Sequence, residues 1–418
     1  MVRELKHTEI GDIPVDWELQ TFDETFRVIS NNTLSRENLN NRGGAVRNIH
    51  YGDILTKFPE VLDCNEEEIP YVNELSLLSS STQLLQDGDI VVADTAEDET
   101  VGKVIEVQNL GDSKLVAGLH TIPCRVKKGD FAPGWLGYYM NSDLFHNQIL
   151  PYITGIKVSS ISKGAISETL ILVPPFDEQE KIVQSLNKIQ LLMTAETKVV
   201  NKIKLVKNGC LSKMFPQKDD TVPEIRLPGF TEAWEQRKLG EVFKEYSEKN
   251  HTELPALTII QGGGTVKREE SDRNLMYDES NLSNYKMVRK DDFIVHLRSF
   301  EGGLEKSLLD GIISPAYHTF HSDVADSRFY YPYFRSHEFI KHKLVPHVYG
   351  IRDGRSIDIA GMKTIEIPYT SIEEQRKIGD YLESLDHLIT LHQRKCDKYS
   401  SIKKGMMSDL LTGKIRLV

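Results

Sequence analysis

Glu178-Gln179-Glu180-Lys181-Ile182 recurs along the chain as Glu374-Gln375-Arg376-Lys377-Ile378. The second copy lies 196 residues after the first, and beyond these segments the two copies stay aligned without a gap for about 40 residues. A long repeated segment of this kind is typical of a duplicated architecture. The chain is therefore expected to contain the same structural plan twice.

The apolar residues after each copy are spaced alternately by four and three, which predicts a coiled-coil seam. The predicted seam residues of the first helix are Ile182, Leu186, Ile189, Met193, Val200 and Ile203. Those of the second are Ile378, Leu382, Leu385, Ile389, Cys396 and Tyr399. Where the first seam becomes polar, at Glu196 and Lys207, the second does so at the equivalent His392 and Lys403.

Start and stop signals bound both helices. Pro174-Pro175 precedes the first helix and Pro216 follows it, whereas Ser371 and Glu374 predict a capping box and Gly413 a C-terminal cap for the second. Each helix should run about 35 to 38 residues, or roughly 55 Å at 1.5 Å per residue. Gly209 and Gly405 also coincide in the repeat, although each glycine should cost about 1 kcal/mol relative to alanine.

The repeat continues more loosely outside the helices. The matched segments are Trp17-Glu18 with Trp234-Glu235, Gly88–Val92 with Asp291–Val295, His120-Thr121 with His318-Thr319, and Gly155-Ile156-Lys157 with Gly350-Ile351-Arg352. Between them, short apolar runs such as Ile90–Ala93 predict strands, and Trp135–Ile149 predicts helix.

The predicted fold class is α+β (mixed α/β), with two globular domains alternating with two long helices that pair as an antiparallel coiled coil with an internal pseudo-two-fold repeat. The expected segments are a first globular domain at 1–173, a central long helix at 174–216, a second globular domain at 217–368 and a C-terminal long helix at 369–418.

Composition limits the possible classes of protein. The 418 residues suffice for two to three domains, and no apolar run has the length of a membrane span, so we expect a cytoplasmic protein. The net charge of −11 does not exclude nucleic acid, because whole-chain charge does not locate a binding face. Residues 394–418 carry seven Lys or Arg against two Asp or Glu. The cysteines lack C-x-x-C spacing, and Cys210 and Cys396 are expected to be apolar seam fillers.

Catalytic motifs are absent from the sequence. It has no phosphate-binding loop, no H-E-x-x-H, no G-x-S-x-G and no Asn/Asp-Pro-Pro-Tyr/Phe methyltransferase motif. Gly262-Gly263-Gly264 lacks a following Lys-Ser/Thr and predicts a turn. His318 and His321 lie in an extended segment and should point to opposite faces, which disfavours a metal site. We expect no catalysis, metal or cofactor in this chain.

Three segments carry a resemblance to a known family. Residues 174–182, 368–378 and 410–416 resemble the specificity subunit of type I restriction-modification enzymes, and the resemblance covers essentially the whole chain. Tyr369-Thr370-Ser371 stands where the family often has a second proline.

The resemblance implies a DNA-binding subunit with two target recognition domains. Each domain would read one half of a split, asymmetric site on double-stranded DNA, and the helix pair would set the half-site spacing. Two modification subunits carrying S-adenosylmethionine and the methylation chemistry would dock on the chain, and separate restriction subunits using ATP and Mg would cut.

For DNA reading we expect cationic and amide side chains on equivalent loops that differ in sequence. The candidate DNA contacts are Lys157, Ser159, Ser160, Arg298, Arg352, Arg355, Arg47, Asn48, Lys267 and Arg268. Arg352 and Arg355 offer bidentate forks to guanine or phosphate, and Lys157 a point contact. The alternative interpretation is a set of ordinary solvent-facing charges.

A different class of function also fits the repeat: a duplicated coiled-coil scaffold that binds protein partners without DNA specificity. The sequence leaves open the bases read, the spacer length, whether a cleavage subunit accompanies the chain, and the oligomeric state of the isolated chain.

Overall fold

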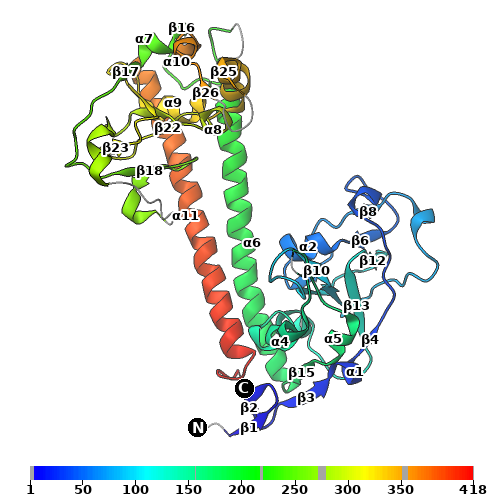
Figure 1. The fold of residues 1–418 in the computed structure, drawn as a ribbon. Helices are drawn as coiled ribbons and strands as arrows, with labels where there is room; N and C mark the ends of the chain where they lie inside the picture. The colour runs from blue at the N-terminus through cyan, green and yellow to red at the C-terminus, as the bar shows by residue number, and fades with distance from the viewer. Residues whose placement is uncertain (1–3, 156, 217–219, 272–278, 351–355, 418) are drawn as a thin grey trace. The chain divides into compact units, whose positions relative to one another are not determined.

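The computed structural model describes residues 4–155, 157–216, 220–271, 279–350 and 356–417. The chain divides into two compact units: unit 1 comprises residues 1–195 and 395–418, and unit 2 comprises residues 196–394. Two long helices, α6 (Phe176–Lys213) and α11 (Ile372–Leu410), follow the globular parts (Figure 1). Each unit contains a globular part and a portion of both helices, so the compact units cut across the four predicted segments.

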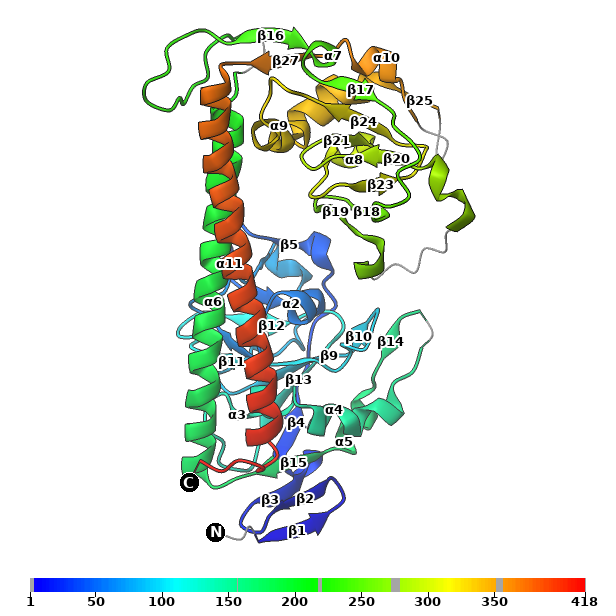
Figure 2. The same ribbon diagram turned by 90° about the vertical axis from the view of Figure 1, so that its left-hand side faces the viewer.

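The two helices run antiparallel, as predicted (Figure 2). In unit 1, Lys403 Nζ donates to Gln190 Oε1 at 2.8 Å. In unit 2, Lys207 Nζ donates to Asp386 Oδ1 at 2.5 Å, and the Cys210 thiol lies 4.0 Å from the Tyr381 hydroxyl. The predicted seam residues of both helices are buried or half-buried.

The start of α11 differs in one detail from the predicted capping box. Ser371 Oγ accepts a hydrogen bond from the Glu374 backbone N–H at 3.3 Å. The Glu374 carboxylate does not return to Ser371, because it accepts hydrogen bonds from Arg226 and Trp234. Half of the box is present, and the carboxylate instead joins the helix to the globular part.

Unit 1 contains a five-stranded sheet of strand order β4-β13-β9-β11-β7 and a four-stranded sheet of strand order β12-β6-β8-β5. The strands of the first sheet are β4 (Phe26–Val28), β7 (Val61–Asp63), β9 (Ile90–Ala93), β11 (Val104–Gln108) and β13 (Thr121–Val126). Those of the second are β5 (Leu39–Asn40), β6 (Arg47–Ile49), β8 (Tyr71–Val72) and β12 (Leu115–Ala117). Paired ribbons are β1 (Leu5–Thr8) with β2 (Gly11–Pro14), β3 (Glu18–Thr21) with β15 (Leu170–Val173), and β10 (Thr95–Ala96) with β14 (Ser159–Ser160). The short helices are α1 (Phe22–Thr25), α2 (Tyr51–Thr56), α3 (Trp135–Tyr139), α4 (Asp143–Ile149) and α5 (Lys163–Ser167).

Unit 2 has a four-stranded sheet of order β17-β24-β21-β22. Its strands are β17 (Lys244–Tyr246), β21 (Phe293–Val295), β22 (Glu305–Lys306) and β24 (His318–His321). Paired ribbons are β16 (Glu235–Lys238) with β27 (Glu366–Tyr369), β18 (Leu257–Ile260) with β19 (Gly264–Lys267), β20 (Lys286–Val288) with β23 (Gly311–Ile313), and β25 (Val348–Tyr349) with β26 (Ser356–Ile357). Its short helices are α7 (Leu239–Val242), α8 (Ser299–Gly302), α9 (Ser327–Phe334) and α10 (Ile359–Met362).

The strand register corrects one predicted match between the halves. Val92 pairs with Ile122 in unit 1, whereas the equivalent Val295 pairs with His318 in unit 2. His318 is therefore the counterpart of Ile122, and the match of His120-Thr121 with His318-Thr319 was wrong by two residues. The corrected register makes Arg125 and His321 equivalent.

A buried clamp joins the globular part of unit 1 to its helices. The Glu178 carboxylate, which is 2% exposed, accepts hydrogen bonds from Trp17 Nε1 at 2.9 Å and from Arg416 Nε at 2.7 Å. The Gln179 side chain accepts from the Ala132 N–H at 2.9 Å. Both side chains of the repeated Glu-Gln pair therefore serve to attach the helix.

Unit 2 repeats this clamp with equivalent residues. Glu374 accepts from Trp234 Nε1 at 3.1 Å and from Arg226 Nε at 2.7 Å, and Gln375 accepts from the Asp326 N–H at 3.0 Å. Arg226 and Arg416 belong to an Ile-Arg-Leu triplet that follows each long helix, at 225–227 and 415–417. Sequence reasoning used Ile415 and Arg416 within residues 410–416 but missed that the triplet is repeated at 225–227.

Candidate nucleic-acid interface

The same end of the central strand pair carries polar and aromatic side chains in both units. In unit 1, β9 ends at Ala93 and its neighbour β13 begins at Thr121. In unit 2, β21 ends at Val295 and its neighbour β24 begins at His318. The strands of each pair run antiparallel, so the residues just after the first strand lie beside those just before the second.

Unit 1 places three rings in a row at this end. The His50 ring lies 4.7 Å from the Tyr51 ring, which meets the His120 ring edge-on at 5.2 Å. His120 adopts a positive φ of 55°, unusual for a residue with a side chain, and its Nδ1 lies 3.3 Å from Thr95 Oγ1. Burial and the nearby Arg36 guanidinium lower the pKa of His50, so its ring is neutral at physiological pH.

A hairpin extends from the same place. Thr95 pairs with Ser160 between β10 and β14, and the Thr154 and Ser160 backbones exchange hydrogen bonds of 3.0 and 2.8 Å. Gly155 turns with a φ of 117°, and a Cβ there would lie 1.9 Å from the Val158 carbonyl oxygen. Lys157 is exposed at the turn. We name the set His50, Tyr51, Thr95, His120, Thr154, Gly155 and residues 157–160 surface 1.

Unit 2 places a different set of residues at the equivalent end. The His296 ring lies 6.2 Å from the Tyr317 ring, and the Arg298 N–H approaches His296 Nδ1 at 3.3 Å. The Arg268 guanidinium lies 5.6 Å from the centre of the Tyr285 ring. We name this set surface 2.

The electrostatics of surface 2 follow from burial beside cations. Burial, with the Arg335 and Arg298 guanidinium groups, lowers the pKa of His296 to about 4. Burial raises the pKa of Tyr317, and the nearby Arg268 opposes that shift. His296 is therefore a neutral ring among fixed positive charges. Its Nε2 is a buried atom for which the described residues provide no hydrogen-bond partner.

The predicted DNA contacts lie in different surroundings. Lys157, Ser159 and Ser160 lie in surface 1, and Arg268 and Arg298 lie in surface 2. Lys267 is exposed and 3.7 Å from Glu270. Arg352 and Arg355 lie outside the described residues.

Arg47 and Asn48 do not face a groove, contrary to the expectation. Both lie in β6, where Arg47 is 9% and Asn48 is 0% exposed. Arg47 donates to the Cys64 carbonyl at 2.6 Å, and Asn48 Oδ1 accepts from Asn32 at 2.8 Å. These contacts join β6 to the segments at Cys64 and Asn32, while Arg47 Nε and Asn48 Nδ2 are buried without a hydrogen-bond partner among the described residues. A sequence pattern of polar residues does not distinguish such burial from exposure.

Sequence reasoning also missed the rings. The rings are His50, Tyr51 and His120 in surface 1, and Tyr285, His296 and Tyr317 in surface 2. Tyr51 begins α2, and the other five lie outside the helices and strands, so segments distant in the sequence are brought together only by the fold. For His296, the available signal was its place directly after the matched segment Phe293–Val295.

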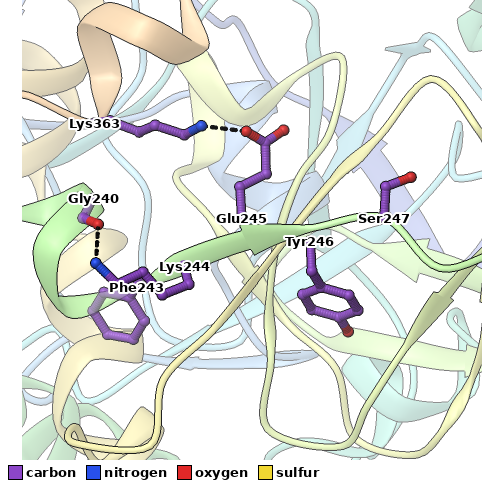
Figure 3. Close-up of a pocket in the computed structure, with 7 residues that line it drawn as sticks. All are labelled: Gly240, Phe243, Lys244, Glu245, Tyr246, Ser247 and Lys363. Carbon is purple, nitrogen blue, oxygen red and sulfur yellow. Dashed lines mark hydrogen bonds and ion pairs between the residues drawn. The ribbon is translucent and has the colours of Figure 1, made fainter.

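Unit 2 has a shallow hollow that contains an ion pair between charged side chains. It is lined by Gly240, Phe243, Lys244, Glu245, Tyr246, Ser247 and Lys363 (Figure 3). Lys363 forms an ion pair with Glu245, which also contacts His318 at 2.7 Å. These contacts join β17, β24 and the end of α10. Across the described ranges, no three His, Cys, Asp or Glu side chains are placed to hold a metal ion, and no helix is long and apolar enough to cross a membrane.

The duplicated units, each with a polar and aromatic surface at the same strand ends, define a class of two-domain binding proteins joined by a helix pair. Residues 14–205 match the family described as "Type I restriction modification DNA specificity domain". This match covers a little under half of the chain, and it makes the chain similar to type I restriction-modification specificity subunits.

Two sequence relatives and one solved structure are similar to long parts of this chain. The putative type I restriction enzyme MjaX specificity subunit of Methanocaldococcus jannaschii is 25% identical over 99% of this chain and 96% of its own length. The MjaVIII specificity subunit of the same organism is 26% identical over 63% of this chain and 66% of its own length. The crystal structure of the S subunit from M. genitalium shares the fold, with a TM-score of 0.55, 14% identity and coverage of 98% of this chain and 99% of that chain. The predicted family and fold class are thereby confirmed.

Proposed function

We propose that units 1 and 2 each read one half of a split, asymmetric DNA site, through surface 1 and surface 2. The observation that carries this proposal is that the same strand ends bear different side chains in the two copies of one scaffold. A two-stranded ribbon such as β10–β14 fits the major groove. Arg268 and Arg298 supply forks for guanine or phosphate, and Lys157 a point contact to phosphate.

The test is a map of methylated adenines in a host that expresses this chain with its cognate modification subunit. A single bipartite motif that depends on this chain supports the proposal. Variants then assign the halves: His120→Ala should alter only one half-site and Arg298→Ala only the other. A map without any motif, together with no binding of the purified complex to genomic DNA fragments, would instead favour the protein-scaffold function.

We also propose that two modification subunits dock on the helix pair. Unit 1 exposes Leu192 (46%) and Ile402 (39%), and unit 2 exposes Val206 (43%) and Leu388 (38%). Leu192 is equivalent to Leu388, and Val206 to Ile402, at the offset of 196. Two equivalent apolar pairs suit two copies of one partner.

These partners would supply the chemistry that acts at the site read by this chain. Methyl transfer would use S-adenosylmethionine in the modification subunits, and cleavage would use ATP and Mg in a restriction subunit, in the cytoplasm where the DNA lies. The docking test is co-purification with the modification subunit. Leu192→Glu with Val206→Glu should weaken it, whereas Leu205→Glu is the control, because the exposed Leu205 has the polar counterpart Ser401.

A further inference from the structure

Glu196 and His392 occupy the same position in the two copies of the repeat, and they contact each other. His392 Nδ1 is hydrogen-bonded to Glu196 Oε2, and the two side chains are 20% and 16% exposed. Because residue 392 lies 196 positions after residue 196, an exchange of α6 with α11 maps this contact onto itself. At this contact, equivalent residues of the two helices face each other.

Two further polar contacts between the helices, those of Lys207 and Lys403, would survive pairing with the wrong helix. Lys207 is equivalent to Lys403, and Asp386 to Gln190. In the structure, Lys207 pairs with Asp386 at 2.5 Å, and Lys403 donates to Gln190 at 2.8 Å and also pairs with the Glu60 carboxylate of unit 1. If α6 packed against α6 of a second copy in the same register, Lys207 would face Gln190 of that copy.

The clamps at the helix ends could also form if α6 paired with α6 of a second copy. Glu178 and Glu374 each bind an arginine from an Ile-Arg-Leu triplet and a tryptophan indole. Because Arg226 and Arg416 each donate to the equivalent glutamate through Nε and a terminal nitrogen, one triplet can replace the other at that carboxylate. Neither the clamps nor the lysine contacts distinguish α11 of the same chain from α6 of another chain.

The central contact does distinguish them. In an α6–α6 pairing, Glu196 would face Glu196 of the second copy in a mostly buried position, and like charges placed opposite each other disfavour such a pairing. A polar contact at a coiled-coil seam is a known determinant of partner choice. We propose that the Glu196–His392 contact selects pairing of the two helices within one chain, and so keeps two different recognition units together. This role does not depend on DNA binding.

Disulfide trapping in the full-length chain tests the proposal. Cys210 lies beside Tyr381 in the native pairing, and the residue equivalent to Tyr381 on α6 is Ser185. In a chain carrying Ser185→Cys, an α6–α6 pairing would place this cysteine beside Cys210 of a second copy. Oxidation would then give a covalent dimer on a non-reducing gel, whereas a Tyr381→Cys chain reports the native pairing as an internal disulfide.

Three backgrounds are compared. The chain with Glu196 intact should give little dimer, and Glu196→Gln, which removes the charge and keeps a hydrogen-bonding side chain, should raise the dimer about tenfold or more. The exchange of both residues, Glu196→His with His392→Glu, should return the dimer to the original level. Circular dichroism verifies that each variant is folded. An unchanged dimer fraction in the folded Glu196→Gln variant, or an exchanged pair that dimerises as readily as Glu196→Gln, would overturn the proposal.

Discussion

Replacement of Arg416 by methionine should destabilise unit 1 selectively. Arg416 donates to the Glu178 carboxylate through Nε and a terminal nitrogen, both at 2.7 Å, and also pairs with Asp16. Glu178 is 2% exposed, so methionine would leave a buried carboxylate without its cation. The chain would lose this clamp while keeping most of the apolar packing of the arginine stem.

The expected loss of unfolding free energy is about 3 kcal/mol. Removing one partner of a buried ion pair costs about 3 to 5 kcal/mol. The lower end applies because the Arg416 side chain is 20% exposed, and because Trp17 Nε1 and the Leu417 N–H still donate to Glu178. A loss of about 3 kcal/mol corresponds to a more than hundredfold increase in local opening.

Hydrogen exchange read by mass spectrometry is the suitable assay, because it resolves the two units in one molecule. Peptides around Trp17 and Glu178 should exchange faster in Arg416→Met, while those around Trp234 and Glu374 should not change. Arg226→Met is the matched control and should show the reverse pattern. In a background of Glu178→Gln, the Arg416→Met replacement should cost less, because no buried charge is left.

The clamp reasoning would be refuted by either of two results. A loss below about 0.5 kcal/mol, the usual range for surface substitutions, would mean that the contact contributes little. Equal acceleration in both units would mean that Arg416 does not act through unit 1.

Four further predictions follow from single contacts. Lys157→Ala should weaken DNA binding for all sequences and reduce the slope of log affinity against log salt by about 1, measured by fluorescence anisotropy of the assembled complex at several salt concentrations. Arg298→Ala should cost about 1 to 3 kcal/mol at one position of one half-site, seen by competition between matched and single-base-changed duplexes. Burial opposes protonation of His321, but Asp292 and Asp323 outweigh it and raise its pKa; the stabilisation is therefore present below about pH 6.5 and is lost as pH rises through the raised pKa. His321→Arg, which imitates the equivalent Arg125, should remove that loss in pH-dependent thermal unfolding. Gly209→Ala should stabilise the chain by about 1 kcal/mol, measured by thermal unfolding, because a Cβ there meets nothing within 4 Å among the described residues.

The helices were predictable from the sequence because their signals are local. A four-three spacing of apolar residues over ten turns has few alternatives, and α6 and α11 begin and end within the predicted segments. The stretch Trp135–Ile149 was also rightly helical, but it is broken into α3 and α4 where Ser142 caps the second helix. The break between α3 and α4 depends on how α3 packs into the core, and the spacing of apolar residues in the sequence does not predict it.

The surfaces were only partly predictable, because they are assembled from distant loops. Lys157 was proposed because it lies in a matched loop, and Arg298 because it lies in a polar stretch; both remain predictions as DNA contacts. Arg47 and Asn48 were misplaced because a buried polar residue in a short strand has the same local pattern as an exposed one. His120 was found only as a textual match, and the strand register shows that its counterpart is not His318.

Duplication itself explains why some residues match and others do not. A clamp works identically wherever it stands, so Trp17, Glu178 and Arg416 have direct equivalents in unit 2. If the DNA site is asymmetric, the two surfaces that read it must carry different side chains. Surface 1 has His120 and surface 2 has Arg298, which are not counterparts in the repeat. A helix pair made of two like copies faces a third demand, because each copy can recognise itself as well as its partner. We propose that the difference between Glu196 and His392 meets that demand, at a position that the symmetry of the repeat makes face itself.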